Sequence, residues 1–146
     1  MRYYIIVILF CVSCSTKQQV ENISELVNYY NQKYLTYQRV NVDIAKIYID
    51  SIYMVSKQNN YEKGIGLAIL NTGLLEHIKG NFNLAISNNE KALAIFSAIK
   101  EDMLIAKTYA ALGVNYWQIG ENDKALIYLF KALKLHETLN LRKETA

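Results

Sequence analysis

Apolar side chains recur at helical intervals over most of the chain. In segment 105–119 the residues Ile105, Tyr109, Leu112 and Tyr116 follow one another at steps of three and four, which places them on one face of a helix. A second segment, 125–139, has apolar residues on one side and mostly charged residues on the other. The pattern therefore predicts two consecutive amphipathic helices near the C-terminus.

The same pair of segments occurs forty residues earlier, and small residues mark the interval. The matching pairs are Gly73 and Gly113, Gly80 and Gly120, Ala85 and Ala125, and Ala92 and Ala132. Gly80 and Gly120 stand between two predicted helices, where the chain must reverse and a residue without a Cβ is favoured. Each forty-residue unit is therefore predicted to be a helix–turn–helix hairpin.

A third, degenerate copy precedes these two. Residues 41–45 align with 81–85, which makes 26–38 its first helix, with Ser24 as the expected N-cap. This copy lacks both glycines, and terminal repeats are expected to be atypical. The predicted fold is an all-α solenoid of about three stacked hairpins. It occupies residues 24–146, in units of about 26–65, 66–105 and 106–146.

The last unit resembles the tetratricopeptide repeat (TPR). The resemblance rests on Tyr109, Leu112, Gly113, Tyr116, Gly120, Ala125, Leu129 and Ala132. Leu129 replaces the usual phenylalanine, and the forty-residue unit exceeds the usual length of about 34, as in the long-repeat variants. The resemblance implies that Gly113 and Ala125 lie where the two helices of a hairpin cross closely. It also implies that Tyr116 and Leu129 fill the gap between hairpins.

The resemblance further implies a groove, since the first helix of each TPR hairpin lines the concave side, where the family binds peptides or helices. The expected groove residues are Tyr30, Tyr34, Tyr37, Leu67, Leu70, Asn71, Leu74, His77, Lys107, Ala110, Val114, Trp117 and Gln118. Trp117 is the expected anchor, with packing between repeats as the alternative. Asn71 and Lys107 occupy places that the family's chaperone-tail binders use to hold a terminal carboxylate, but the rest of that clamp is absent.

The N-terminus has a different character. After Arg2, ten apolar residues at 3–12 cover about half of the ~20 that a membrane-spanning helix needs. One positive residue, a short apolar run and small residues are typical of a secretory signal peptide.

The end of this run is more specific. The sequence Cys-Val-Ser-Cys at 11–14 resembles the lipobox of bacterial lipoproteins, with cysteine where leucine is usual. The resemblance implies that residues 1–13 are removed and that Cys14 is lipidated, so that 14–23 form the anchor and a polar tether. An ordinary signal peptide and an uncleaved anchor are the alternatives.

Composition narrows the functions further. Hydrophobic residues make up 52% of the chain and charged residues 20%, with a net charge of +3. This excludes a disordered chain and the strongly basic balance of a nucleic-acid binder. Two cysteines and two histidines are too few for a zinc ribbon or an iron–sulfur site. We find no constellation of catalytic groups and expect no cofactor and no bound metal.

These observations predict a non-enzymatic scaffold, lipid-anchored in the bacterial cell envelope, that binds another protein or a peptide. The alternative is the N-terminal part of a membrane regulator with a histidine kinase or DNA-binding output domain. The period places residues 141–146 in the first turn of a fourth hairpin, so we expect further repeats to follow, with a frayed tail as the alternative. Self-association through the open last hairpin is also expected.

Overall fold

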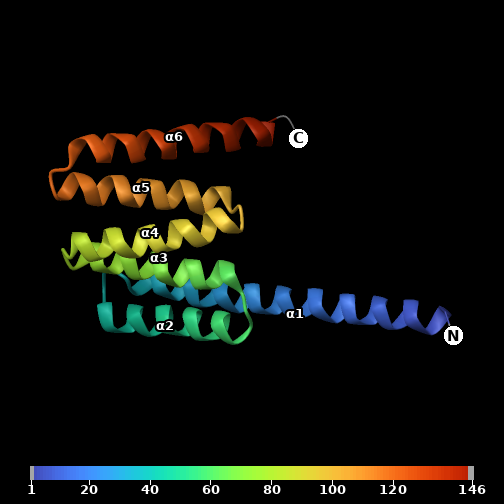
Figure 1. The fold of residues 1–146 in the computed structure, drawn as a ribbon. Helices are drawn as coiled ribbons and strands as arrows, with labels where there is room; N and C mark the ends of the chain where they lie inside the picture. The colour runs from blue at the N-terminus through green and yellow to red at the C-terminus, as the bar shows by residue number, and fades with distance from the viewer. Residues whose placement is uncertain (1, 145–146) are drawn as a thin grey trace.

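A computed structural model describes the backbone of residues 2–144 and the side chains of residues 18–141 and 143. The described chain consists of six helices without a strand (Figure 1). They are α1 (Arg2–Tyr37), α2 (Val42–Gln58), α3 (Glu62–Ile78), α4 (Phe82–Ala98), α5 (Asp102–Gln118) and α6 (Asn122–Glu144). The predicted all-α fold is confirmed.

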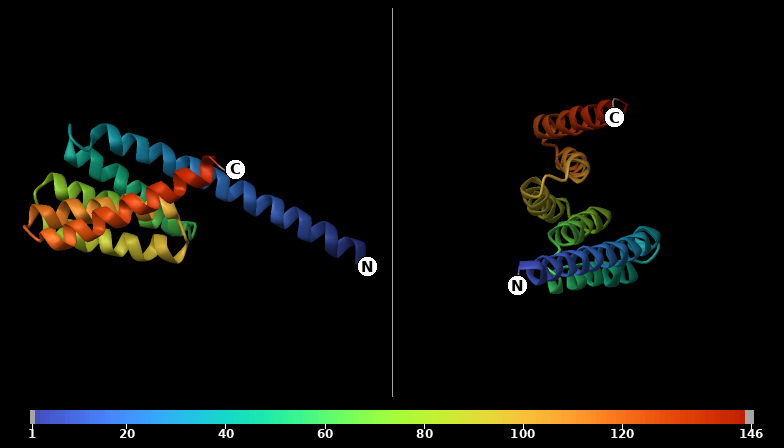
Figure 2. Two further views of the ribbon diagram at one scale, coloured as in Figure 1. Left: turned by 90° about the horizontal axis from the view of Figure 1, so that it is seen from above. Right: turned by 90° about the vertical axis from the view of Figure 1, so that its right-hand side faces the viewer.

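The helices form three antiparallel hairpins, α1–α2, α3–α4 and α5–α6, and each helix packs against the next one along the chain. The hairpins stack in one direction to form a helical-repeat solenoid (Figure 1). Seen along the helices, α3 and α5 lie on one side of the stack and α4 on the other (Figure 2). Helices α3 and α5 also contact each other directly, although α4 separates them in sequence.

The turns explain the regular spacing. From α2 onward a new helix begins every twenty residues, at 42, 62, 82, 102 and 122. Four turns contain a residue with positive φ, and these are Asn60 (51°), Gly80 (82°), Lys100 (58°) and Gly120 (80°). The next N–H in each turn donates to a carbonyl five residues earlier, at 2.8 to 3.0 Å. This pattern satisfies carbonyls that the helix end leaves unpaired.

The hairpin boundaries differ from the expected ones. The turns between hairpins fall at residues 59–61 and 99–101, a few residues before the expected boundaries near 65 and 105. The period determines the length of a unit but not where it starts. Because Asn60 and Lys100 occupy these turns, no glycine marked them in the sequence.

The two helices of a hairpin approach closely at the predicted small residues. A Cβ added to Gly73 would lie 3.1 Å from the carbonyl oxygen of Ala85, and one added to Gly113 would lie 3.1 Å from that of Ala125. The alanines at 85, 92, 125 and 132 are all buried. One core cluster joins α1, α2 and α3, and a second, around Phe96, joins α3 and α4 with partly buried residues of α5.

Helix α1 begins earlier than expected. It is continuous from Arg2 to Tyr37, so the prediction that Ser24 caps the first helix is wrong. No glycine or proline occurs in this stretch to end a helix. Its N-terminal part extends well beyond the hairpins (Figure 1), and residues 18–22 are exposed. The lipidation prediction concerns Cys14, whose side chain lies outside the described residues.

Candidate functional site: a groove between α3 and α5

A hollow of about 280 Å³ lies on the side of the stack where α3 and α5 meet. We call it the α3–α5 groove. It is lined by Arg39, Leu74, His77, Lys107, Ala110, Ala111, Val114 and Asn115. Arg39 comes from the turn between α1 and α2, and the others come from α3 and α5. The groove therefore brings together all three hairpins.

Small side chains create the hollow. Ala110 and Ala111 of α5 stand where the previous repeat has Leu70 and Asn71, forty residues earlier. The larger pair is completely buried in α3, whereas the two alanines leave space beside Val114. The floor of the groove is therefore apolar.

A hydrogen bond ties the two helices together beside this floor. The amide nitrogen of Asn115 donates to the carbonyl of Ala111 at 2.8 Å, so the Oδ1 atom of Asn115 is an acceptor. The Nδ1 atom of His77 lies 2.8 Å from this oxygen and must donate to it. The His77 ring also packs against Phe82, with ring centroids 5.4 Å apart.

The groove is positively charged. Arg39 and Lys107 line it, and no carboxylate is among its lining residues. Partial desolvation lowers the pKa of Lys107 below its usual 10.5, because burial disfavours the charged form. Among the described residues neither Arg39 nor Lys107 forms an ion pair, whereas Lys63 pairs with Glu101 at 3.0 Å. The groove thus combines an apolar floor with two cations that lack a partner.

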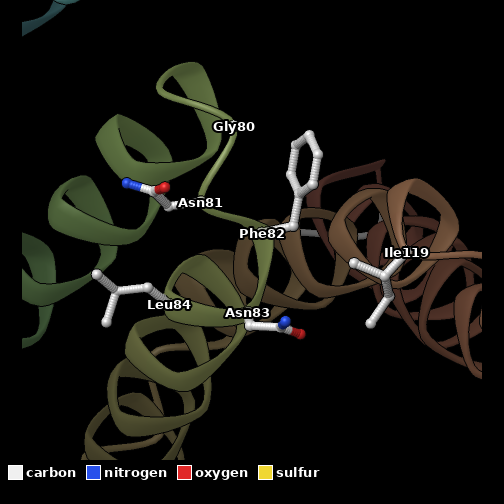
Figure 3. A pocket seen from close by; sticks show the side chains of 6 residues that line it. All are labelled: Gly80, Asn81, Phe82, Asn83, Leu84 and Ile119. Atoms are coloured by element: carbon white, nitrogen blue, oxygen red, sulfur yellow. The ribbon is translucent and has the colours of Figure 1, made fainter.

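A second depression, of about 540 Å³, lies beside the turn between α3 and α4 (Figure 3). It is lined by Gly80, Asn81, Phe82, Asn83, Leu84 and Ile119. The labelled side chains surround it without converging, and its polar side chains are two neutral amides. Although it is larger, it lacks the charged side chains that line the α3–α5 groove.

The family profile of the tetratricopeptide repeat matches residues 66–138, half of the chain. The chain belongs to the tetratricopeptide repeat family. This confirms the family resemblance of the last two units, whose helices α3, α4 and α5 fall almost entirely within the match. A search among curated proteins finds no match to this chain.

TPR hairpins form a non-enzymatic fold for protein interaction. The described side chains contain no group of three or more histidine, cysteine or acidic residues placed to hold a metal ion. In the same part of the chain no helix has the length and apolar character needed to cross a membrane.

Five of the expected groove residues line the α3–α5 groove, and they are Leu74, His77, Lys107, Ala110 and Val114. Four others do not, because Tyr34, Leu67, Leu70 and Asn71 are buried in the core. Helix α3 is the central helix of the stack and packs on several neighbours, so its buried face is broader than a single stripe predicts.

The burial of Asn71 also settles its role. Its side-chain Nδ2 donates to Oδ1 of Asn31 at 2.8 Å, and its backbone carbonyl accepts from the Tyr34 hydroxyl at 3.4 Å. Desolvation raises the pKa of Tyr34, which stays neutral in the core. Asn71 therefore cross-links α1 and α3 and is not exposed to a ligand in the manner of the chaperone-tail binders.

The remaining expected groove residues lie outside the lining. Tyr30 and Tyr37 are half-buried and pack against Tyr48 of α2, with ring centroids 6.4 and 5.8 Å apart. Trp117 is 62% exposed, so packing between repeats does not account for it. Gln118 is likewise exposed at the end of α5.

Tyr116 and Leu129 behave differently from each other. Tyr116 stacks on Tyr128 of α6 at 5.5 Å and donates its hydroxyl to Glu90 of α4 at 3.2 Å, so it does join two hairpins. Burial and the Glu90 carboxylate raise the pKa of Tyr116 to about 12. Leu129 instead packs over Gly113 within its own hairpin and is 40% exposed, because no helix of the described chain covers the far side of α6.

Three lining residues were missed in the sequence. Ala111 and Asn115 follow Lys107 at steps of four, so a wider helical face would have included them. Arg39 lies in a turn, and no helical period could place it. It reaches the groove because the first hairpin packs on α3 and α5 also contacts α3.

Proposed function

We propose that this TPR protein is a non-enzymatic scaffold that binds a peptide or a helix of another protein in the α3–α5 groove. The observation that carries the proposal is the hollow itself, an apolar floor with polar groups on its rim. Ligand sites combine apolar area with a few polar groups that determine orientation. Trp117, exposed one helical turn beyond Val114, extends the apolar surface along α5.

Filling the groove tests this proposal. In Ala110→Leu the new side chain matches Leu70 of the previous repeat, so the helix should be retained while the hollow is lost. The probe is a phage-displayed library of random dodecapeptides selected on the full chain. We expect the selected peptides to bind Ala110→Leu at least tenfold more weakly. Ala94→Leu, at an exposed position of α4, is the control and should bind normally. Equal binding to Ala110→Leu would contradict the proposal.

The lipid anchor is a separate part of the proposal. We infer from Cys-Val-Ser-Cys at 11–14 that Cys14 carries acyl chains which hold the protein in the bacterial cell envelope. Each buried methylene contributes about 0.8 kcal/mol to such attachment. The test is the intact mass of the native protein extracted from membranes. A chain that starts at Cys14 with a lipid adduct is expected, and an unmodified N-terminus would exclude the anchor. A much larger chain would instead favour the membrane regulator.

We also propose that two copies associate through the apolar face of α6. The internal helix α4 offers the comparison. Ile86 is 8% exposed in α4, which packs between α3 and α5, whereas the equivalent Leu126 of α6 is 55% exposed. The same face of α6 carries Leu129, Phe130 and Leu133 at helical spacing. It has the character of a surface that a further helix pair covers inside the stack.

A further inference from the structure

The strongest unexplained feature of the groove is its charge. Arg39 and Lys107 reach it from different hairpins, and no carboxylate is among the other residues that line it. Four other lysines form ion pairs, at positions 46, 63, 79 and 124. The two groove cations thus lack the compensation that these lysines have.

Lys107 lines the groove and its side chain is exposed, so a ligand can reach its ammonium group. An ammonium beside an apolar floor is stabilised by an anionic partner. A ligand carboxylate would supply that partner and would meet a second cation in Arg39. Such charge complementarity contributes more to the choice of partner than to the affinity of binding.

The size of the groove limits what can enter. Its volume of about 280 Å³ is below the usual range for sites of drug-sized molecules, about 300–1,000 Å³. One or two side chains fit such a space. The alanines and Val114 on the floor favour an aliphatic side chain next to the charged one.

We propose that the α3–α5 groove selects a partner segment in which an internal aspartate or glutamate stands beside an aliphatic residue. The carboxylate pairs with Lys107 and Arg39, and the aliphatic side chain rests on Ala110, Ala111 and Val114. This inference rests on the proposed function and adds the chemistry of the partner. The carboxylate belongs to a side chain because Asn71, an amide that could help to hold a chain terminus, is buried and already bonded to Asn31.

The experiment uses the same dodecapeptide library and the full chain. We expect the selected peptides to be enriched in aspartate or glutamate next to leucine, isoleucine or valine. The best binder is then synthesised as two peptides, both with an amidated C-terminus. One keeps the aspartate or glutamate, and in the other this residue is replaced by asparagine or glutamine. Fluorescence anisotropy should show about tenfold weaker binding of the amide form, the usual effect of losing one charge-assisted bond.

Variants of the protein locate the effect. Lys107→Met and Arg39→Gln should each weaken the binding of the acidic peptide. In Lys107→Met, most of the difference in affinity between the acidic peptide and its amide form should vanish. Lys91→Met is the control, because Lys91 is exposed on α4 outside the groove, and it should behave as the wild type. Circular dichroism should show the same helix content and melting temperature for all three variants.

The outcomes separate the two proposals. Selected peptides that are apolar without acid enrichment, yet sensitive to Ala110→Leu, would overturn this inference and leave the proposed function standing. An amide peptide that regains binding when its C-terminal carboxylate is freed would also overturn it in favour of a chain terminus. If the library yields no binder, both proposals fail.

Discussion

At the scale of single residues, the residue with positive φ in a helix-ending turn need not be glycine. Four turn residues adopt positive φ, but only Gly80 and Gly120 are glycines. Asn60 and Lys100 adopt the same conformation with a Cβ, which costs about 1–2 kcal/mol for most residues. Asparagine tolerates this region better than lysine does, so Lys100 is the most strained of the four.

Two matched substitutions measure this strain. Gly80→Ala should lower the free energy of unfolding by about 1 kcal/mol. No neighbouring atom lies within 4 Å of the added Cβ, so the cost is purely conformational. Lys100→Gly should raise it by about 0.5 kcal/mol. Urea unfolding followed by circular dichroism gives both values. A loss of stability in Lys100→Gly would show that the lysine side chain contributes more than its backbone costs.

Glu76 makes the turn at Gly80 sensitive to acid. Its carboxylate accepts from the side chains of Asn81 at 2.7 Å and Lys79 at 2.9 Å, and these hydrogen bonds lower its pKa below 4.5. A carboxylate with a lowered folded-state pKa stabilises the protein above about 4.5. This contribution is lost as the pH falls through the folded-state pKa.

We therefore expect Glu76→Gln to be less stable than the wild type at neutral pH and to approach it below pH 4. Urea titrations between pH 3 and 7 provide the measurement. Glu90→Gln is a suitable comparison, because the exposed Glu90 accepts from the Tyr116 hydroxyl at 3.2 Å and takes part in no ion pair among the described residues. A gap between Glu76→Gln and the wild type that stays constant over this range would refute the linkage.

At the scale of the helices, the buried face of α4 contains a polar residue at a position where the other hairpins have an aliphatic one. Asn89 is completely buried opposite Gly73, and its side-chain nitrogen and oxygen have no hydrogen-bond partner among the described residues. The equivalent positions in the other hairpins are Ile49 and Leu129. Leu129 packs over Gly113 just as Asn89 packs over Gly73, so leucine fits this position in the same backbone.

We predict that Asn89→Leu raises the free energy of unfolding by about 1–3 kcal/mol, since it removes the desolvation cost of two unpaired polar atoms. Thermal and urea unfolding would measure the gain. The control is Asn88→Leu, where the native amide donates to the carbonyl of Leu84 at 2.9 Å and no comparable gain is expected. A destabilised Asn89→Leu would mean that the amide has a role in folding or packing that leucine cannot replace.

At the scale of the whole molecule, one face of α6 is left uncovered by the described residues. The interior hairpins cover one another's apolar faces, but α6 has no helix beyond it in the described chain. Phe130 is 65% exposed on this face, and the previous repeat has Glu90 at the equivalent position. A charge is thus tolerated by the fold at this place.

The proposed association of two copies therefore depends on α6. Sedimentation equilibrium of the wild type should show a mass that rises with concentration, and Phe130→Lys should remain monomeric with unchanged unfolding. Ile47→Lys, at a position that is 61% exposed on α2 at the opposite end of the stack, is the control and should associate like the wild type. A wild-type protein that stays monomeric at all concentrations would exclude the association.

The sequence by itself determined the helices, the forty-residue unit, the glycine turns and the family. These features depend on interactions within one hairpin, either along a helix between residues three or four positions apart or across the hairpin, as between Gly73 and Ala85. Such contacts recur in each hairpin and therefore leave a period in the sequence. The same reasoning found Leu74, His77, Lys107, Ala110 and Val114, which share the exposed face of their helices.

Only the tertiary structure decided which side chains on these helix faces are buried and which are accessible. Asn71 and Leu70 have the spacing of groove residues, yet neighbouring helices cover them. Arg39 has no helical spacing at all, yet it lines the groove. Burial depends on contacts between hairpins whose relative positions arise from the packing of the whole stack. The helical period of one segment therefore cannot report which of its side chains remain accessible to a partner.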